Sequence, residues 1–135
     1  MNYWTKIFFV VFALGISIIT WVQINNLTRP SSAPVPVIQK LYFEGTIGGK
    51  HAMSISIDQV GRNITGTVIN THREIRKLKG SISEDKTFLF SEYLKDRVTG
   101  TFEGKILSNG NMRGSWSAPP GVKRYPFYLN RKQRI

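Results

Sequence analysis

Apolar side chains recur at every second position through most of the chain after residue 40. In the run LYFEGTI, Leu41, Phe43 and Ile47 share one side of an extended backbone. This period of two is typical of half-buried strands, because successive side chains point to opposite faces. The alternating runs are LYFEGTI (41–47), HAMSISID (51–58), NITGTVIN (63–70), LKGSI (78–82), TFLFSEY (87–93), VTGTFEGKI (98–106), NMRGSWS (111–117) and RYPFYLN (124–130). We therefore expect an all-β domain with eight strands.

Short segments rich in glycine, proline and polar residues separate these runs. They lie at residues 48–50, 58–62, 70–73, 83–86, 94–97, 108–111 and 118–123. Such compositions are typical of tight turns, so consecutive strands are expected to pair as an antiparallel meander. Eight strands with one apolar face can bury that face in an up-and-down barrel or in a sandwich.

A five-residue unit, apolar–x–Gly–Thr/Ser–apolar, favours the barrel. Its copies are FEGTI (43–47), ITGTV (64–68), LKGSI (78–82), VTGTF (98–102) and MRGSW (112–116). The alternation places each glycine on the inward face, where a small closed barrel is sharply curved and has little room. In the fourth copy, Val98 and Gly100 are expected to point inward and Thr99 outward. We therefore expect a compact eight-stranded antiparallel barrel.

Three of these segments carry a resemblance to known barrels. ITGTV (64–68), VTGTFEG (98–104) and MRGSWS (112–117) resemble the Gly-Thr-aromatic strands of avidin-like and lipocalin-like small β-barrels, and of many small bacterial exported domains. The resemblance covers about residues 40–130 and implies architecture alone. It does not imply biotin binding, because avidin-type pockets are lined by several tryptophans and this part of the chain has only Trp116.

A long apolar segment precedes the predicted barrel. Residues 7–22 carry no charge, and the apolar run is 19 residues long when it is extended back to Trp4. A helix of that length spans roughly 28 Å, close to the roughly 30 Å hydrocarbon core of a bilayer. We expect a transmembrane signal-anchor helix over residues 1–22. A cleaved secretory signal is the alternative, although no good cleavage site follows.

The rest of the chain divides into a linker at 23–37, rich in Pro, Ser and Asn, the barrel at 38–130 and a basic tail at 131–135. Lys6 precedes the apolar segment, and only Arg29 follows it before the barrel. Together with the terminal amine, this small asymmetry favours a cytoplasmic N-terminus. We expect a single-pass protein of the inner (cytoplasmic) membrane with a periplasmic, extracytoplasmic barrel. The chain has no cysteine, which fits either side.

The predicted domain is strongly basic. The chain has 19 Lys and Arg residues and 8 Asp and Glu residues, and all but two of the basic residues and all of the acidic ones follow residue 37. The resulting net charge of +9 favours anionic partners such as phosphate-bearing lipids, cell-wall polymers or nucleotides. A solvated basic surface beside an anionic membrane is the alternative explanation.

The densest basic cluster lies in THREIRKLK (71–79). Guanidinium groups bind phosphate or carboxylate through two parallel hydrogen bonds, so this segment is the candidate anion-binding rim of the barrel. An interruption of the alternation at Arg76 and Lys77 suggests a bulge or loop edge there. A solvated edge strand protected by charge is the alternative. The candidate anion-binding residues are His72, Arg73, Arg76, Lys77 and Lys79.

Glu92 is the candidate polar residue of the barrel interior. It follows Phe88 and Phe90 in the inward register. A buried carboxylate needs a partner if it is to remain charged. Glu92 can therefore pair with an arginine as a structural tie, or it can mark a ligand pocket near one end of the barrel.

No catalytic motif is evident. His51 and His72 have no spaced carboxylate or second histidine that would suggest a metal site. A P-loop, a Rossmann fingerprint and a nucleophile elbow are all missing from the sequence. We therefore expect a non-enzymatic protein that uses no cofactor and no metal.

These features predict a membrane-anchored binding or accessory module that contacts anionic partners through a basic rim. The expected partners are the bilayer, through the N-terminal helix, an anionic ligand or membrane surface, and a membrane protein; nucleic acid is not expected. One alternative is a cytoplasm-facing effector whose barrel senses an anionic cyclic nucleotide, as in antiphage signalling, although such effectors usually carry more than one membrane helix. Another is a structural subunit of a membrane complex.

Overall fold

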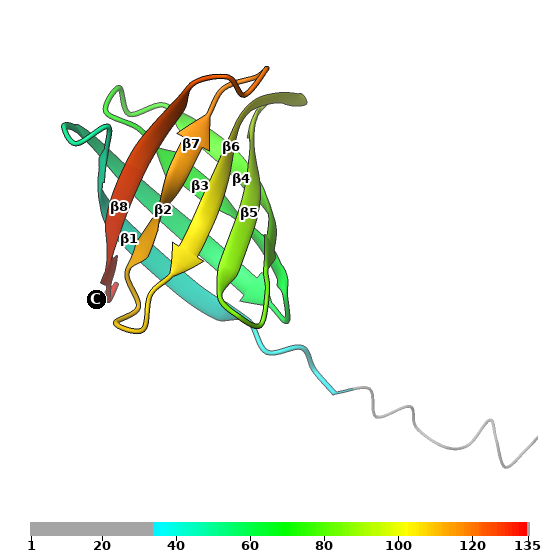
Figure 1. Ribbon diagram of the computed structural model, residues 1–135. Helices are drawn as coiled ribbons and strands as arrows, with labels where there is room; N and C mark the ends of the chain where they lie inside the picture. Colours follow the sequence, from blue (N-terminus) through cyan, green and yellow to red (C-terminus); the bar gives the residue numbers. More distant parts are fainter. Residues whose placement is uncertain (1–33, 135) are drawn as a thin grey trace, which may run out of the picture. The chain divides into compact units, whose positions relative to one another are not determined.

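The computed structural model describes residues 34–134, which form eight strands joined by short turns (Figure 1). Each strand pairs antiparallel with the next, and the last pairs with the first, so the sheet closes into a barrel. The predicted all-β, eight-stranded antiparallel barrel is confirmed. The strands are β1 (Gln39–Ile47), β2 (His51–Val60), β3 (Asn63–Ile69), β4 (Ile75–Ile82), β5 (Thr87–Leu94), β6 (Arg97–Ile106), β7 (Met112–Ser117) and β8 (Arg124–Lys132).

The barrel has two ends, which we name from their positions in Figure 1. The upper end carries the turns at residues 48–50, 70–74, 95–96 and 118–123, and the lower end carries those at 61–62, 83–86 and 107–111. β1 begins and β8 ends at the lower end. Every strand of the closed hydrogen-bond ladder lies within residues 39–132, so the barrel closes without the rest of the chain.

Apolar side chains fill the interior. Phe43, Phe90 and Phe102 are almost completely buried. The rings of Phe88 and Phe90 stack with centroids 4.7 Å apart, and Phe102 meets Phe127 edge-on at 5.5 Å. Burying each such side chain contributes about 1.5–3 kcal/mol to folding. Because the centre is packed, binding surfaces have to lie at the ends of the barrel or on its outer wall.

The inward glycines lie where neighbouring strands approach closely. Gly104 and Gly114 face each other across β6 and β7, and a Cβ atom on Gly104 would overlap the carbonyl oxygen of Arg113. Gly66 and Gly80 meet a backbone carbonyl of the adjacent strand in the same way. The inward face has little room at these glycines, as the sequence pattern suggests. A side chain there would collide with the backbone of the next strand.

The expected side-chain alternation is wrong at the start of β6. A β-bulge there pairs Glu92 with Gly100 and Tyr93 with Val98, which leaves Thr99 without a partner in the ladder. Val98 is therefore 41% exposed, whereas the hydroxyl of Thr99 reaches the side chain of Glu92. A bulge adds one residue to a strand, so the side chains before it point to the opposite face from the one that strict alternation predicts. The sequence pattern alone does not reveal this change.

The predicted transmembrane helix at residues 1–22 lies outside the described residues, as does most of the predicted linker. Within residues 34–134, no helix is long and apolar enough to cross a membrane.

The change Gly104→Ala is expected to lower the free energy of unfolding by about 1–3 kcal/mol, because the added methyl group must displace the carbonyl group of Arg113. Urea titration of the full chain measures this quantity. Ser81→Ala, an exposed position of β4, is the control and should change it by less than about 0.5 kcal/mol. Equal effects of the two changes would contradict the close approach of β6 and β7.

Candidate functional site

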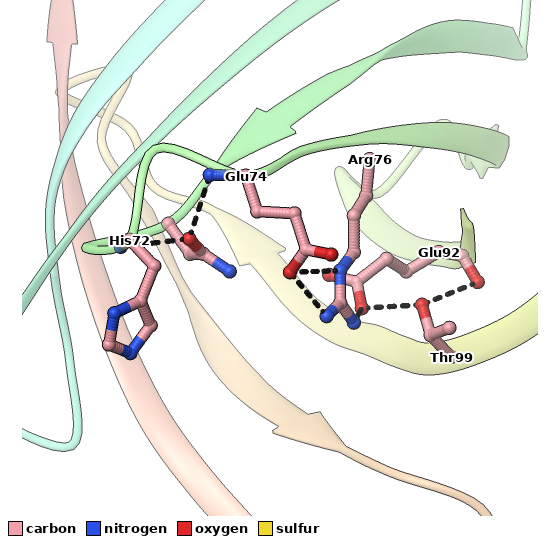
Figure 2. A network of polar contacts seen from close by, with 6 residues as sticks. His72, Glu74, Arg76, Glu92 and Thr99 are labelled. Atoms are coloured by element: carbon pink, nitrogen blue, oxygen red, sulfur yellow. Dashed lines mark hydrogen bonds and ion pairs between the residues drawn. The ribbon is translucent and has the colours of Figure 1, made fainter.

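A network of polar side chains lies at the upper end of the barrel (Figure 2). Glu92 of β5 is only 5% exposed. Its Oε1 accepts hydrogen bonds from Nη1 of Arg76 at 3.1 Å and from Oγ1 of Thr99 at 2.8 Å. Arg76 comes from β4, and the bulge of β6 presents Thr99. The buried carboxylate therefore has two donors from two different strands.

Arg76 is shared between two carboxylates. Its Nη2 and Nε donate to Oε2 of Glu74 at 2.7 and 3.3 Å. The hydrogen bond from Arg76 lowers the pKa of Glu74, and Glu74 is the main cause that raises the pKa of Arg76. The side chain of Asn70 accepts the backbone N–H groups of His72 and Glu74, which fixes the turn that presents Glu74. One cation thus faces two anions.

The structure does not bring the candidate rim residues into one site. β4 keeps a regular register through Arg76 and Lys77, so the expected interruption there is wrong, and the bulge lies in β6 instead. The regular register turns Arg76 inward and leaves Lys77 and Lys79 exposed on the outer wall.

The remaining rim residues lie in the turn before β4. Arg73 has a left-handed backbone, with a φ of 59°. The imidazole of His72 points away from the Arg76 network (Figure 2). Anion binding by the candidate rim residues stays a prediction, but Arg76 already has two carboxylate partners. Glu92, for its part, has the arginine partner expected of a structural tie.

A small apolar pocket of about 250 Å³ also opens at the upper end. The indole of Trp116 lies against Gly100, where a Cβ atom would overlap its Nε1. That Nε1 is buried and makes no hydrogen bond to any residue that the structure describes. The ring centroids of Trp116 and Tyr125 are 6.0 Å apart. The pocket is lined by Ile47, Gly48, His51, Trp116 and Tyr125.

A wider recess of about 800 Å³, which we call the lower recess, opens at the opposite end of the barrel. Its floor includes the apolar side chains of Leu41 and Ile82. Lys86, Lys105 and Arg131 supply three cations to its walls. No carboxylate is among the described residues that line it.

Hydrogen bonds around the lower recess fix the backbone of two of these basic residues. The carbonyl group of Lys86, in the turn before β5, accepts the N–H of Ile106 at 2.9 Å. The N–H of Arg131 donates to Oδ1 of Asn111 at 3.0 Å. The guanidinium of Arg131 lies 5.5 Å from the ring centroid of Phe43, within range of a cation–π contact. Arg131 therefore covers the lower end of the core.

The turn that carries Lys86 has two acidic side chains, Glu84, which pairs with Arg62, and Asp85. Hydrogen bonds from Ser83 and Thr87 lower the pKa of Asp85 to about 2, and the charge of Lys105 adds a smaller contribution. The carboxylate is thus engaged by its own turn, and it does not line the lower recess.

Sequence reasoning missed the lower recess. Lys86, Lys105 and Arg131 are far apart in the sequence and form no local run of charge. The sequence does give one indication for Arg131. It continues the every-second-residue pattern of the inward residues Phe127 and Leu129, so its side chain is expected on the same face. For Lys86 and Lys105, the pairing of β5 with β6 brings the two residues together.

No family model and no curated protein sequence matches this chain. The resemblance to avidin-like and lipocalin-like barrels therefore holds for the small closed barrel fold, and no family relationship supports more than that.

Replacing Arg76 with methionine is expected to lower the free energy of unfolding by about 3 kcal/mol, because the buried carboxylate of Glu92 loses its charged partner. The double change Arg76→Met/Glu92→Met should recover most of that loss, since apolar side chains replace both charges. Urea titration of the two variants and of Glu92→Met alone completes a double-mutant cycle. Strictly additive effects would show that the pair does not interact.

Proposed function

We propose that this protein is a non-enzymatic binding or accessory module that contacts an anionic partner. The supporting observation is the way in which its charges are paired. Within residues 34–134, four basic side chains form ion pairs with five of the eight acidic ones. Thirteen basic side chains in this range make no ion pair, so the positive charge is largely available to a partner.

The pairing of Glu92 supports a binding role over a catalytic one. A general acid or base needs a free carboxyl group within reach of a substrate. The carboxylate of Glu92 instead accepts from Arg76 and Thr99. We take this network to be structural, because it joins β4, β5 and β6 at the upper end.

The proposal includes the apolar segment at residues 4–22 as a single-pass anchor in the inner membrane, with the barrel on the periplasmic side. A module held beside a bilayer meets phosphate-bearing lipids and anionic polymers at high local concentration, and its basic charge suits both. The same charge also suits a cytoplasm-facing sensor of an anionic nucleotide. The side of the membrane on which the barrel lies distinguishes the periplasmic module from the cytoplasm-facing sensor.

Full-length protein in a nonionic detergent is expected to bind inorganic polyphosphate, because unpaired cations attract the phosphate groups. The dissociation constant should rise at least tenfold between about 50 and 300 mM salt, since ions screen contacts between exposed charges. Fluorescence anisotropy of labelled polyphosphate measures it, with labelled dextran as the uncharged control. Affinity for polyphosphate no greater than for dextran would contradict the proposal.

A reporter enzyme that is active only outside the cytoplasm, fused after Ile135, is expected to be active in a bacterial host. The apolar segment should carry the barrel across the inner membrane and remain with it in the membrane fraction. A reporter that is active only in the cytoplasm is the matched control. Activity of that second fusion alone would overturn the extracytoplasmic assignment and favour the nucleotide sensor.

A further inference from the structure

We propose that the lower recess binds a phosphate ester that carries an apolar group. This inference rests on the proposed function, because it assigns the anionic partner to one place on the barrel and to one chemical class. It is supported by the cations of the recess, the neutral donors between them and the apolar floor.

The three cations reach the lower recess from separate elements of the fold. Lys86 lies in the turn between β4 and β5, Lys105 on β6 and Arg131 on β8. None of the three forms an ion pair with a residue in the range 34–134. Like charges around one concavity repel one another, and a bound anion would relieve that repulsion. Lysine offers a point charge and arginine a planar fork, both of which suit phosphate oxygens.

Neutral hydrogen-bond donors lie between the cations. Gln39, Gln59, Ser108 and Asn109 line the recess. The side-chain amide of Gln59 already donates one hydrogen bond to the carbonyl group of Gly61 at 2.9 Å. Oδ1 of Asn109 accepts the N–H of Asn111 at 3.0 Å, which leaves the amide hydrogens of Asn109 free to donate. Each phosphate oxygen can accept more than one hydrogen bond, so neutral donors can add to the contacts that the three cations make.

The floor of the recess is apolar. Ile82 and Leu41 are 2% and 5% exposed and belong to the core, and Ile106 packs against it. Directly before Gln39, the apolar side chains of Val37 and Ile38 are exposed at the same end of the barrel. A cavity of about 800 Å³ is larger than a phosphate ion requires, so an apolar group joined to the phosphate would fill the remaining space.

Three other sites among residues 34–134 differ from the lower recess in charge or in lining. The pocket at the upper end is lined by apolar groups and His51, without a lysine or arginine. In the Arg76 network, the positive charge of Arg76 is already paired with two carboxylates. A groove between β1–β3 and the C-terminal residues contains Lys40, Lys132 and Arg134 and shares Arg131 with the lower recess. It differs from the recess because its lining includes a carboxylate, Asp58, whose Oδ1 lies 3.1 Å from Nζ of Lys40.

Two sources could supply this chemistry, a soluble phosphate ester and the headgroup of a membrane lipid. Hexyl phosphate, used below its micelle-forming concentration, is the probe for the shared chemistry. Inorganic phosphate tests the contribution of the apolar floor. Vesicles of phosphatidylglycerol, compared with vesicles of phosphatidylcholine, test whether a lipid surface can present the group.

The test compares two variants that lose the same charge. Lys86→Gln/Lys105→Gln/Arg131→Gln removes the cations of the lower recess, and Arg73→Gln/Lys77→Gln/Lys79→Gln removes three exposed cations elsewhere. The experiment uses residues 34–135, which contain the whole closed ladder and leave out the apolar segment at residues 4–22. Thermal melting shows that each variant is folded before its affinity is measured by calorimetry.

The recess variant should bind hexyl phosphate at least tenfold more weakly than the unchanged protein, and the comparison variant within threefold of it. Inorganic phosphate should bind at least tenfold more weakly than hexyl phosphate. Flotation with phosphatidylglycerol vesicles that is lost in the recess variant assigns the site to a lipid headgroup. Binding of hexyl phosphate alone assigns it to a soluble ester.

Unchanged affinity of the recess variant, or an equal loss in both variants, would overturn the assignment of the site. Equal affinities for inorganic and hexyl phosphate would overturn the role of the apolar floor. Polyphosphate binding that survives in the recess variant but is lost in the comparison variant leaves the proposed function standing and moves the site to the candidate rim. If the unchanged protein binds no anion at all, the proposed function itself fails.

Discussion

The close approach of neighbouring backbones at the inward glycines is the constraint on which this barrel depends. At Gly104 and Gly114 there is no room for a Cβ atom, and Gly66 and Gly80 meet adjacent carbonyl groups in the same way. These contacts let a sheet of eight strands curve tightly enough to close around a core of packed apolar side chains. A filled interior excludes ligand capture at the centre, so binding has to use the ends of the barrel or its outer wall.

The two ends use their charges differently. At the upper end, Arg76 is held between Glu74 and Glu92, and the bulge of β6 adds a donor from Thr99. The buried carboxylate of Glu92 at that end is therefore already paired with a cation of the protein. At the lower end, the recess gathers three cations without a carboxylate in its described lining, and the nearby Asp85 is held by its own turn. This asymmetry supports an anionic partner at the lower end.

The sequence predicts the fold well because both of its main signals are local. Alternation identifies the strands, and recurring inward glycines identify closure, so the barrel and most inward positions follow from the sequence. The register fails at Val98, because a bulge leaves no trace in a period of two. The candidate site is less accessible to sequence reasoning. The visible charge run at residues 71–79 is dispersed by a regular strand, whereas Lys86, Lys105 and Arg131 meet only in the folded sheet, where they come from separate elements.

The central claim is that the lower recess, and not the charge run at residues 71–79, holds the anionic group. Amide chemical shifts of the barrel, recorded by NMR during a titration with hexyl phosphate, test this most directly because they locate the contact without any substitution. The account predicts that the largest changes fall on the amides of Lys86, Ile106, Gly110 and Arg131, which surround the recess. Largest changes on residues 72–79, with those four amides unmoved, would contradict it.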